Sequence, residues 1–295
     1  MSVAAHLIVG KREEPFLGAT LESLHGVVDS VFVNENSGEP DGINARVLTA
    51  SRFAREGRLF IDSAPFANFS DARNRVLALH RRHGGGEWAA FIDADELHRP
   101  IAATVAGHLA TLPADIAVVD GYTRHYLQSF TWYTAIERRM SFFRVTPNLR
   151  WERPVHEQLV GVSGATLAIP YVYDHYGWVL PMRRQAEKGR QYASLGQAGR
   201  THADADLDDE DPIDFFRDFW PRALRYDGDH PAAALAVRVE LERRDPGFSA
   251  RVDAAVREAQ TLRTHATNIV RRAGFEYRWR GRFLDSRARR LMEPH

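Results

Sequence analysis

Short apolar runs alternate with amphipathic stretches in the N-terminal part of the chain. Apolar runs with the length of buried strands occupy residues 3–9, 28–33, 58–61 and 89–92. Helical spacing of apolar side chains separates them, around residues 15–24, 45–55 and 70–80. Strands that alternate with helices at this spacing predict right-handed crossovers and a mostly parallel sheet.

The pattern changes to longer strands after a helix expected at residues 101–112. Further strands are expected at residues 116–126, 139–145, 159–162 and 167–173, followed by a helix at 182–195. Residues 203–211 hold six acids in nine positions and predict an exposed linker or cap. Helices are expected beyond it at 214–226, 232–243 and 249–264. The sequence therefore predicts an α/β domain over residues 1–200 and a helical C-terminal extension over residues 201–295.

Carboxylates gather where the run at residues 89–92 ends. Asp93, Asp95 and Glu96 follow Ile92 directly, and strand alternation places Asp93 and Asp95 on the same side. Two hard oxygen ligands at the carboxyl end of a strand suit Mg²⁺ or Mn²⁺, especially when the cation also holds a diphosphate. A solvated acidic turn is the alternative interpretation of the same residues.

Polar residues follow two other predicted elements that should face the same crevice. The second strand ends at Asn34, Glu35 and Asn36, whose side chains could reach a ligand. Arg73 lies near the start of a helix, where it could pair with a phosphate, and Asn74 could orient nearby loops. A helix salt bridge and a capping contact are the alternative roles of these two residues.

Composition excludes several classes of protein. The chain is 44% hydrophobic and 11% aromatic, which is typical of a folded domain. Its formal net charge is zero, so no stable nucleic-acid partner is predicted. It has no cysteine, which excludes disulfides, thiolate metal sites and cysteine nucleophiles. A basic signal-peptide lead and an apolar run of membrane-spanning length are also missing, so we expect a cytoplasmic protein.

The C-terminal segment combines arginines with aromatic residues. Residues 271–290 hold eight arginines among Phe275, Tyr277, Trp279 and Phe283. Such a segment can bind a lipid surface, an anionic polymer or a protein partner. The simpler interpretation is a C-terminal helix packed on the domain with a solvated arginine face, and peripheral contact with the inner membrane face through residues 271–290 is the alternative.

Five landmarks in order resemble the family 2 glycosyltransferases of the GT-A fold. They are residues 7–16, 31–37, 69–74, 91–96 and 154–157, within a resemblance that covers about residues 5–190. The resemblance implies a GT-A (Rossmann-like) nucleotide-sugar-binding domain, a nucleoside-diphosphate sugar as donor (UDP-linked by expectation), and Mn²⁺ or Mg²⁺. It also implies an inverting hexosyltransferase that acts on a glycan, a lipid-linked molecule or a natural product.

The resemblance also implies roles for individual residues. Asp95 would bind the metal, and Asp93 would contact the ribose or the metal through water. His175, in the sequence His175-Tyr-Gly177, would be a third metal ligand. The second strand of the family usually ends in aspartate, so Glu35 or Asn36 is expected to contact the nucleoside here.

The base that deprotonates the acceptor is expected among three residues. The Glu-Asp pair usual in the family is replaced by His156-Glu157. Glu157 is the first candidate, and Glu96 and His156 follow it.

Two other functions compete with this interpretation. A sugar-phosphate nucleotidyltransferase also uses an α/β sheet and aspartate-held metal, but Gly10 is a single glycine followed by Lys11, Arg12 and acids. A non-catalytic binding protein could use the arginine and aromatic residues of segment 271–290. The sequence leaves the acceptor, the donor base and the oligomeric state open.

Overall fold

The computed structural model describes residues 2–179, 190, 194–195, 218–281 and 285–293. Two compact units are present. The first comprises Met1–Tyr122, Arg138–Tyr173 and Arg282–His295, and the second comprises Thr123–Glu137 and Asp174–Gly281. The domain boundary predicted near residue 200 falls outside the described residues and stays a prediction.

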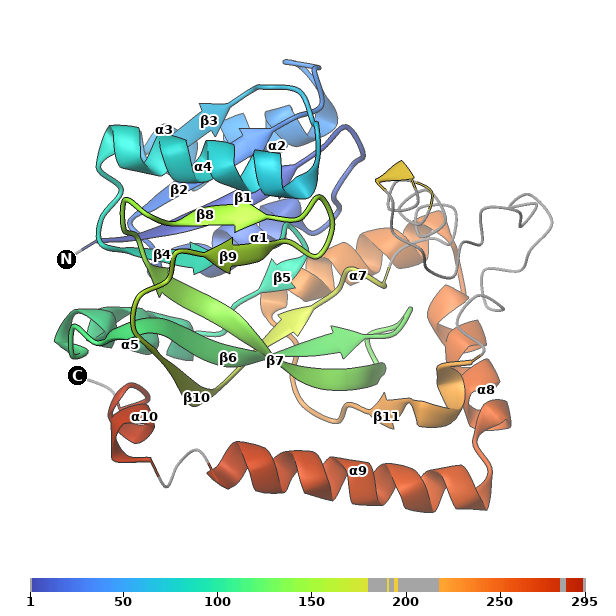
Figure 1. Cartoon of the computed structure of the whole chain (residues 1–295). Coiled ribbons are helices and arrows are strands. Elements are labelled where there is room, and N and C mark those ends of the chain that lie inside the picture. Colours follow the sequence, from blue (N-terminus) through green and yellow to red (C-terminus); the bar gives the residue numbers. More distant parts are fainter. Residues whose placement is uncertain (1, 180–189, 191–193, 196–217, 282–284, 294–295) are drawn as a thin grey trace. The chain divides into compact units, whose positions relative to one another are not determined.

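Four parallel strands form one half of the main sheet. They are β1 (Val3–Val9), β2 (Ser30–Glu35), β3 (Leu59–Asp62) and β4 (Trp88–Phe91), in the order β3-β2-β1-β4. The α/β class and the parallel sheet predicted from the sequence are confirmed (Figure 1). In the register, Val9 lies opposite Glu35 and Asn34 lies opposite Asp62. The carboxyl ends of β1, β2 and β3 therefore lie side by side.

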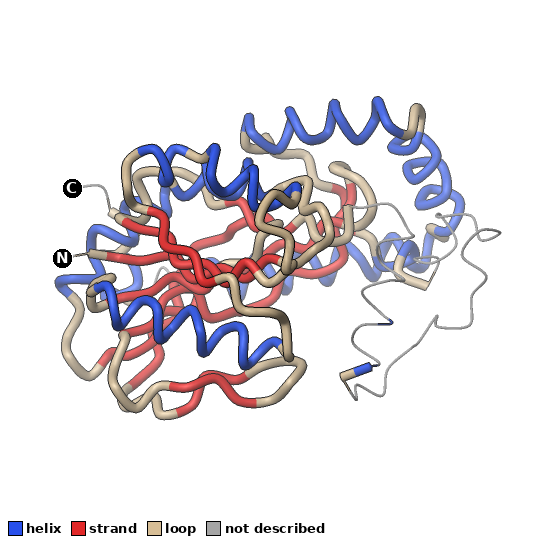
Figure 2. Tube along the Cα trace, turned by 90° about the horizontal axis from the view of Figure 1, so that it is seen from above, coloured by secondary structure: helices blue, strands red, loops and turns tan. Residues whose placement is uncertain are grey.

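Helices cover both faces of these parallel strands (Figure 2). The five helices of this region are α1 (Leu17–Leu24), α2 (Ile43–Ala50), α3 (Arg52–Arg55), α4 (Phe69–His83) and α5 (Ile101–His108). Alternation along β1 separates its two faces. Val3, Ala5, Leu7 and Val9 join the core that includes α1, whereas Ala4 packs with Val76 of α4 on the other face.

Two predicted helix boundaries were wrong. The helix expected at residues 45–55 is two helices, because Ser51 interrupts it and its side chain accepts a hydrogen bond from the backbone N–H of Ala54. The helix expected at 70–80 is α4, which runs from Phe69 to His83, and its cap is Asn68, whose Oδ1 accepts from the N–H of Asp71 at 2.9 Å.

Longer strands form the other half of the sheet. β6 (Ile116–Tyr126), β7 (Trp132–Arg144) and β10 (Ala165–His175) continue the order as β4-β7-β6-β10-β5, where β5 is Glu96–Leu97. β7 is antiparallel to β4 and begins earlier than the sequence predicted. The ribbon of β8 (Arg150–Glu152) and β9 (Gln158–Val160) is a separate antiparallel pair.

The second unit contains the helices of the C-terminal part. They are the 3-10 turn η4 (Trp220–Arg222), then α7 (Ala232–Arg244), α8 (Phe248–Ala259) and α9 (Leu262–Gly281). The short strand β11 (Leu224–Arg225) pairs with Trp132 and Tyr133 of β7. In the first unit, α10 (Ser286–Arg290) forms part of the C-terminal segment.

Two helix predictions in this region were wrong where the structure describes it. Residues 218–226 form η4 and β11 because pairing with β7 outweighs helix propensity. The helix expected at 249–264 ends at Ala259, and the hydroxyl of Thr261 accepts from the N–H of Thr264 at the start of α9. The helix expected at 182–195 and the acidic linker at 203–211 fall almost wholly outside the described residues.

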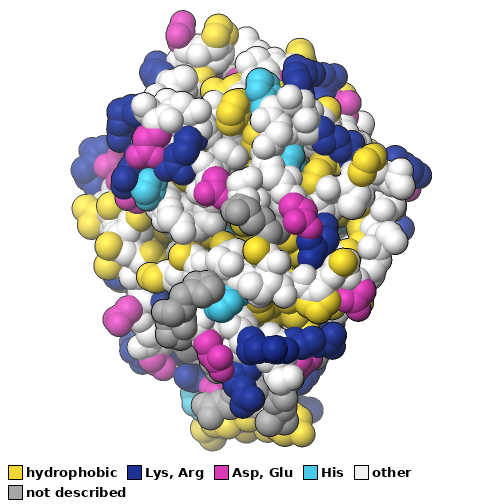
Figure 3. Space-filling view, turned by 90° about the vertical axis from the view of Figure 1, so that its left-hand side faces the viewer, with side chains coloured by type: hydrophobic (Ala, Val, Ile, Leu, Met, Phe, Trp, Pro, Cys, Tyr) yellow, Lys and Arg dark blue, Asp and Glu magenta, His cyan; other side chains and the backbone are white. Residues whose placement is uncertain are grey.

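Charges of both signs share the surface. On the face drawn in Figure 3, Lys and Arg side chains are interspersed with Asp and Glu. Across the described residues, none of the helices is long and apolar enough to cross a membrane.

His98 is a buried titratable group in the first unit. Its ring stacks on that of Tyr173 with centroids 4.8 Å apart, and its Nδ1 hydrogen-bonds the hydroxyl of Tyr171. Burial lowers the pKa of His98 to about 3, with a smaller effect of the Arg139 charge. Because the unfolded state takes up this proton near pH 6.5 and the folded state does not, stability falls as pH drops below about 6.5.

We expect this histidine to contribute to acid sensitivity. On going from pH 7 to pH 5, His98 should lower the unfolding free energy by about 2 kcal/mol. His98→Gln should remove this part of the decrease. Urea unfolding at both pH values measures it, with the exposed His83→Gln as control. If the unfolding free energy changes equally between pH 7 and pH 5 in the wild type and in His98→Gln, His98 does not contribute to the acid sensitivity.

Candidate active site

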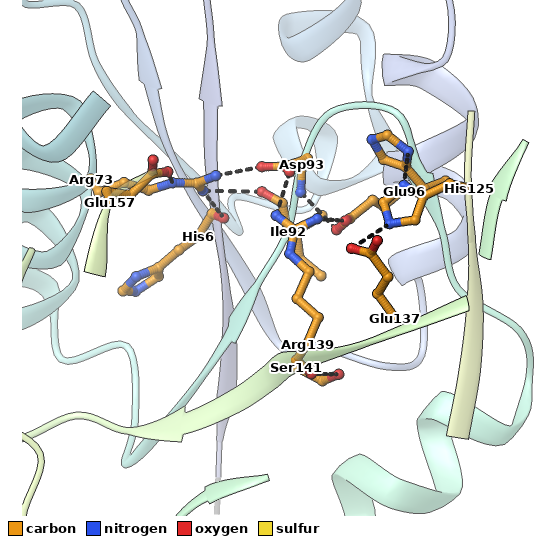
Figure 4. A network of polar contacts seen from close by, with 11 residues as sticks. His6, Arg73, Ile92, Asp93, Glu96, His125, Glu137, Arg139, Ser141 and Glu157 are labelled. Atoms are coloured by element: carbon orange, nitrogen blue, oxygen red, sulfur yellow. Dashed lines mark hydrogen bonds and ion pairs between the residues drawn. The ribbon is translucent and has the colours of Figure 1, made fainter. Parts of the chain in front are cut away.

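Two arginines hold the carboxylate of Asp93 at the end of β4 (Figure 4). Arg73 of α4 donates to Oδ1 and Arg139 of β7 donates to Oδ2, each at 2.5 Å. Both guanidinium groups also lie over the ring of Phe91, with Cζ at 4.1 and 4.8 Å from its centroid. Asp93 therefore joins α4, β4 and β7 through charge-assisted hydrogen bonds.

Glu96 is the buried member of the same network. Its side chain is fully buried, and it accepts hydrogen bonds from Arg139 at 2.5 Å and from the backbone N–H of Asp93 at 3.0 Å. Burial raises the pKa of Glu96 to about 8, and the nearby Arg139 partly opposes that shift. In this arrangement the Glu96 carboxyl fixes the strand end and is not open to an acceptor.

Arg73 connects Asp93 to Glu157. The Nε of Arg73 lies 3.3 Å from Oε1 of Glu157. Its Nη1 donates to the carbonyl of His6 in the middle of β1 at 3.3 Å and to that of Ile92, directly after β4, at 3.1 Å. The side chain of Arg73 is 1% exposed. This geometry favours a positioning role for Arg73 over the phosphate contact predicted from the sequence.

The loop that carries Glu157 has unusual backbone geometry. Arg153 and His156 adopt positive φ angles of 74° and 53°, where non-glycine residues are uncommon. The carbonyl of Pro154 in the same loop accepts from the N–H of Phe69 at 3.1 Å, and the Asn74 amide makes two hydrogen bonds of 2.8 Å with the backbone of Trp151. As expected for Asn74, its side chain orients the neighbouring ribbon. Strain of this kind, about 1–3 kcal/mol per residue, gathers at functional sites.

Polar side chains also line the carboxyl ends of β2 and β3. Asn34 donates to Oδ2 of Asp62 at 2.7 Å, and its Oδ1 accepts from Asn36 at 2.9 Å. Glu35 points to the opposite side of the strand, is buried, and accepts from the N–H of Ser37. Of the two residues expected to contact a nucleoside, Asn36 lies in a polar chain with Asn34 and Asp62, and Glu35 does not.

The three residues predicted to bind metal are divided between the two units. Asp93 and Asp95 belong to the first unit, and Asp95 is buried. His175 belongs to the second unit, where its Nδ1 lies 3.0 Å from Nδ1 of His125. Across the residues that the structure describes, no group of three or more His, Asp or Glu side chains is arranged to hold a metal ion. The metal roles therefore stay predictions.

Arg139 is a residue of this network that the sequence does not indicate. It lies in the predicted strand at 139–145, but nothing local distinguishes it from Arg138 beside it. The antiparallel pairing of β7 with β4 brings Arg139 to the carboxylates. Alternation along β7 turns Arg138 the other way, to an ion pair with Asp120.

Comparison with known proteins gives a partial likeness in fold. No protein-family model matches the chain, and no curated protein does. Mannosyltransferase PcManGT from Pyrobaculum calidifontis, in complex with GDP-Man and Mn²⁺, aligns at 14% identity over 91% of this chain and 87% of that chain, with a TM-score of 0.37. S. aureus TarS 1-349 aligns at 11% identity over 90% of this chain and 83% of that chain, also with a TM-score of 0.37.

A third solved structure matches over a shorter stretch. Glucosyl-3-phosphoglycerate synthase from Mycobacterium tuberculosis, in complex with Mn²⁺, UDP and phosphoglyceric acid, aligns at 19% identity with a TM-score of 0.30. The alignment covers 41% of this chain and 43% of that chain. Likeness at these scores assigns no residue role to this protein.

We expect Arg139 and Arg138 to differ sharply when replaced. Arg139→Met should lower the unfolding free energy by about 3 kcal/mol, because it leaves Glu96 and Asp93 without a shared cation. Arg138→Met removes the ion pair with Asp120, and the side chain of Arg138 is 45% exposed. This replacement should lower the unfolding free energy by less than about 1 kcal/mol. Urea unfolding measures both.

The same pair of variants has a pH signature. The folded-state pKa of Glu96 lies above its unfolded value, so its ionisation costs stability as pH rises through the window from about 4.5 to 8. Without Arg139 this pKa should rise further, and the gap between the two variants should widen from pH 6 to pH 9. A gap that narrows over this range would contradict the proposed contact.

Proposed function

We propose that the protein is an inverting, metal-dependent glycosyltransferase of the GT-A kind that uses a nucleoside-diphosphate sugar. The observation that carries this proposal is the network at the end of β4. There Asp93, Glu96 and Glu157 are held by Arg73 and Arg139 next to Asp95. Ligands of open α/β sheets bind beyond the carboxyl ends of parallel strands, which is where these groups lie.

The donor nucleoside would bind beside the same edge. Asn36, Asn34 and Asp62 offer amide and carboxylate groups at the ends of β2 and β3, next to β1. These groups suit the hydrogen bonds of a base or a ribose. We assign Asn36 to this contact in preference to Glu35, which is buried on the other side of β2.

The residues present fit a metal that arrives with the diphosphate. Mg²⁺ and similar ions are commonly held by one or two carboxylates together with substrate phosphates and water. Asp95 is the proposed ligand, and Asp93, already held by two arginines, would orient the strand end and reach the ribose or a metal-bound water. His175 remains a proposed further ligand. When bound, the cation would neutralise charge on the leaving diphosphate.

Glu157 is the proposed base. Inversion requires a group that takes the proton of the acceptor hydroxyl as that oxygen attacks the anomeric carbon. The Arg73 contact fixes the carboxylate of Glu157 relative to Asp93. Glu96 is the weaker candidate because it is fully buried and its pKa is raised to about 8, so we assign it a positioning role.

Donor binding can be tested without knowledge of the acceptor. UDP, GDP, TDP and CDP are each added to the protein in the presence of Mn²⁺. We expect one of them, UDP, to raise its thermal stability. At a concentration of 100 Kd the gain is about 2.7 kcal/mol. Asp95→Asn should abolish the metal-dependent part of the shift, whereas the exposed Asp115→Asn should keep it. If none of the four nucleotides stabilises the protein, with or without metal, the proposal is excluded.

The base assignment is tested by transfer itself. Once a donor is known, Glu157→Gln should keep the nucleotide-induced stabilisation and lose transfer by a factor of about 10²–10⁴. Glu152→Gln, on the neighbouring strand β8 and paired with Arg150, is the matched control and should transfer normally. If Glu157→Gln transfers at the wild-type rate, another residue is the base.

A further inference from the structure

Helix α9 of the second unit carries exposed apolar side chains along one side. Leu262 is 92% exposed, Ile269 61%, Val270 71% and Tyr277 81%. Leu262 and Ile269 are seven residues apart, as are Val270 and Tyr277, and at 3.6 residues per turn all four lie on one face of the helix. We call these four residues the apolar stripe. Burying an apolar side chain stabilises a protein, so a stripe left in water over four turns requires an explanation.

The opposite face of α9 is fixed against its own unit. Asn268 is buried, and its Nδ2 donates to the carbonyls of Pro221 at 3.0 Å and Ala223 at 3.2 Å. Arg271 donates to the carbonyls of Arg222 at 2.8 Å and Thr134 at 3.0 Å. These contacts set the rotation of α9 about its axis, so the apolar stripe points away from the unit.

A basic hollow borders the apolar stripe. It has a volume of about 420 Å³, and Ile269 belongs both to it and to the stripe. Trp132 and Leu224 contribute apolar walls. The arginines that line the hollow are Arg225, Arg257 and Arg272, and His265 lines it with them.

The charge of this region is positive. Asp227 lies 3.0 Å from Arg225 and 3.7 Å from Arg272, and Glu276 lies 3.4 Å from Arg272, so two carboxylates serve two of the three arginines that line the hollow. For Arg257, the described part of the chain contains no ion pair. The sequence of α9 itself has five arginines and a single acid, Glu276.

We propose that the apolar stripe and the basic hollow dock the second unit onto an anionic lipid surface. The stripe would lie at the boundary of headgroups and acyl chains, and the hollow would hold a lipid phosphate near Arg257. An apolar helix face flanked by arginines is the arrangement of helices that lie in a membrane interface. Cations near an anionic surface add binding free energy, and a purely apolar protein partner would not need them. This proposal does not rest on the glycosyltransferase function.

Vesicle binding tests the proposal with the full chain. Flotation with phosphatidylcholine vesicles containing about one third phosphatidylglycerol should recover the protein, and phosphatidylcholine alone should not. Val270→Asp should weaken binding at least tenfold. Val239→Asp, on α7 of the same unit and with its valine 70% exposed, is the matched control and should bind as the wild type does.

The hollow is tested by its least paired cation. Arg257→Gln should weaken binding to anionic vesicles about fivefold, the effect of one cation near such a surface, and raised salt should reduce the difference. Arg243→Gln on α7, which removes an exposed pair with Glu240, is the control. Thermal unfolding checks that each variant is folded.

Three outcomes would overturn the proposal. The first is no binding to anionic vesicles by the wild-type chain. The second is equal binding to both vesicle types, which would indicate adsorption of apolar side chains without headgroup recognition. The third is that the wild-type chain does not bind vesicles but self-associates, and that Val270→Asp abolishes this self-association. The apolar stripe would then be an interface between copies of this chain.

Discussion

The buried charge of Arg73 constrains several elements of the first unit at once. A guanidinium taken out of water is costly unless carboxylates and carbonyls surround it, and Asp93, Glu157, His6 and Ile92 supply them. Its partners come from β1, β4 and the loop between β8 and β9. The helix, the parallel strands and the ribbon are therefore held in one arrangement at the edge where the site lies. Arg139 extends the same arrangement to the antiparallel strand β7.

This constraint gives two nearby glutamates different properties. Glu96 is buried beneath the strand end, so burial raises its pKa and the carboxyl acts as part of the framework. Glu157 sits on a loop with two residues at positive φ and contacts Arg73 at its edge. The same network therefore holds one glutamate inside the framework and the other at its edge.

The second unit adds a surface with another kind of chemistry. Its helix α9 uses polar contacts of Asn268 and Arg271 to pack, and leaves its apolar side chains outside. An amphipathic helix on a globular domain usually packs its apolar face against the domain and exposes its polar face. Docking on an anionic surface would explain this order.

Sequence alone determined the strands β1, β4 and β6, because contiguous apolar residues decide a buried strand locally. It also placed the carboxylates after β4 and the polar residues after β2. Tertiary structure decided that Arg139 rather than Arg138 reaches Asp93, because the register of β7 against β4 selects the side. It likewise decided that Leu224 and Arg225 pair with β7 and that α9 turns its apolar side outward. Local patterns report neighbours within a few residues, whereas these outcomes depend on partners far along the chain.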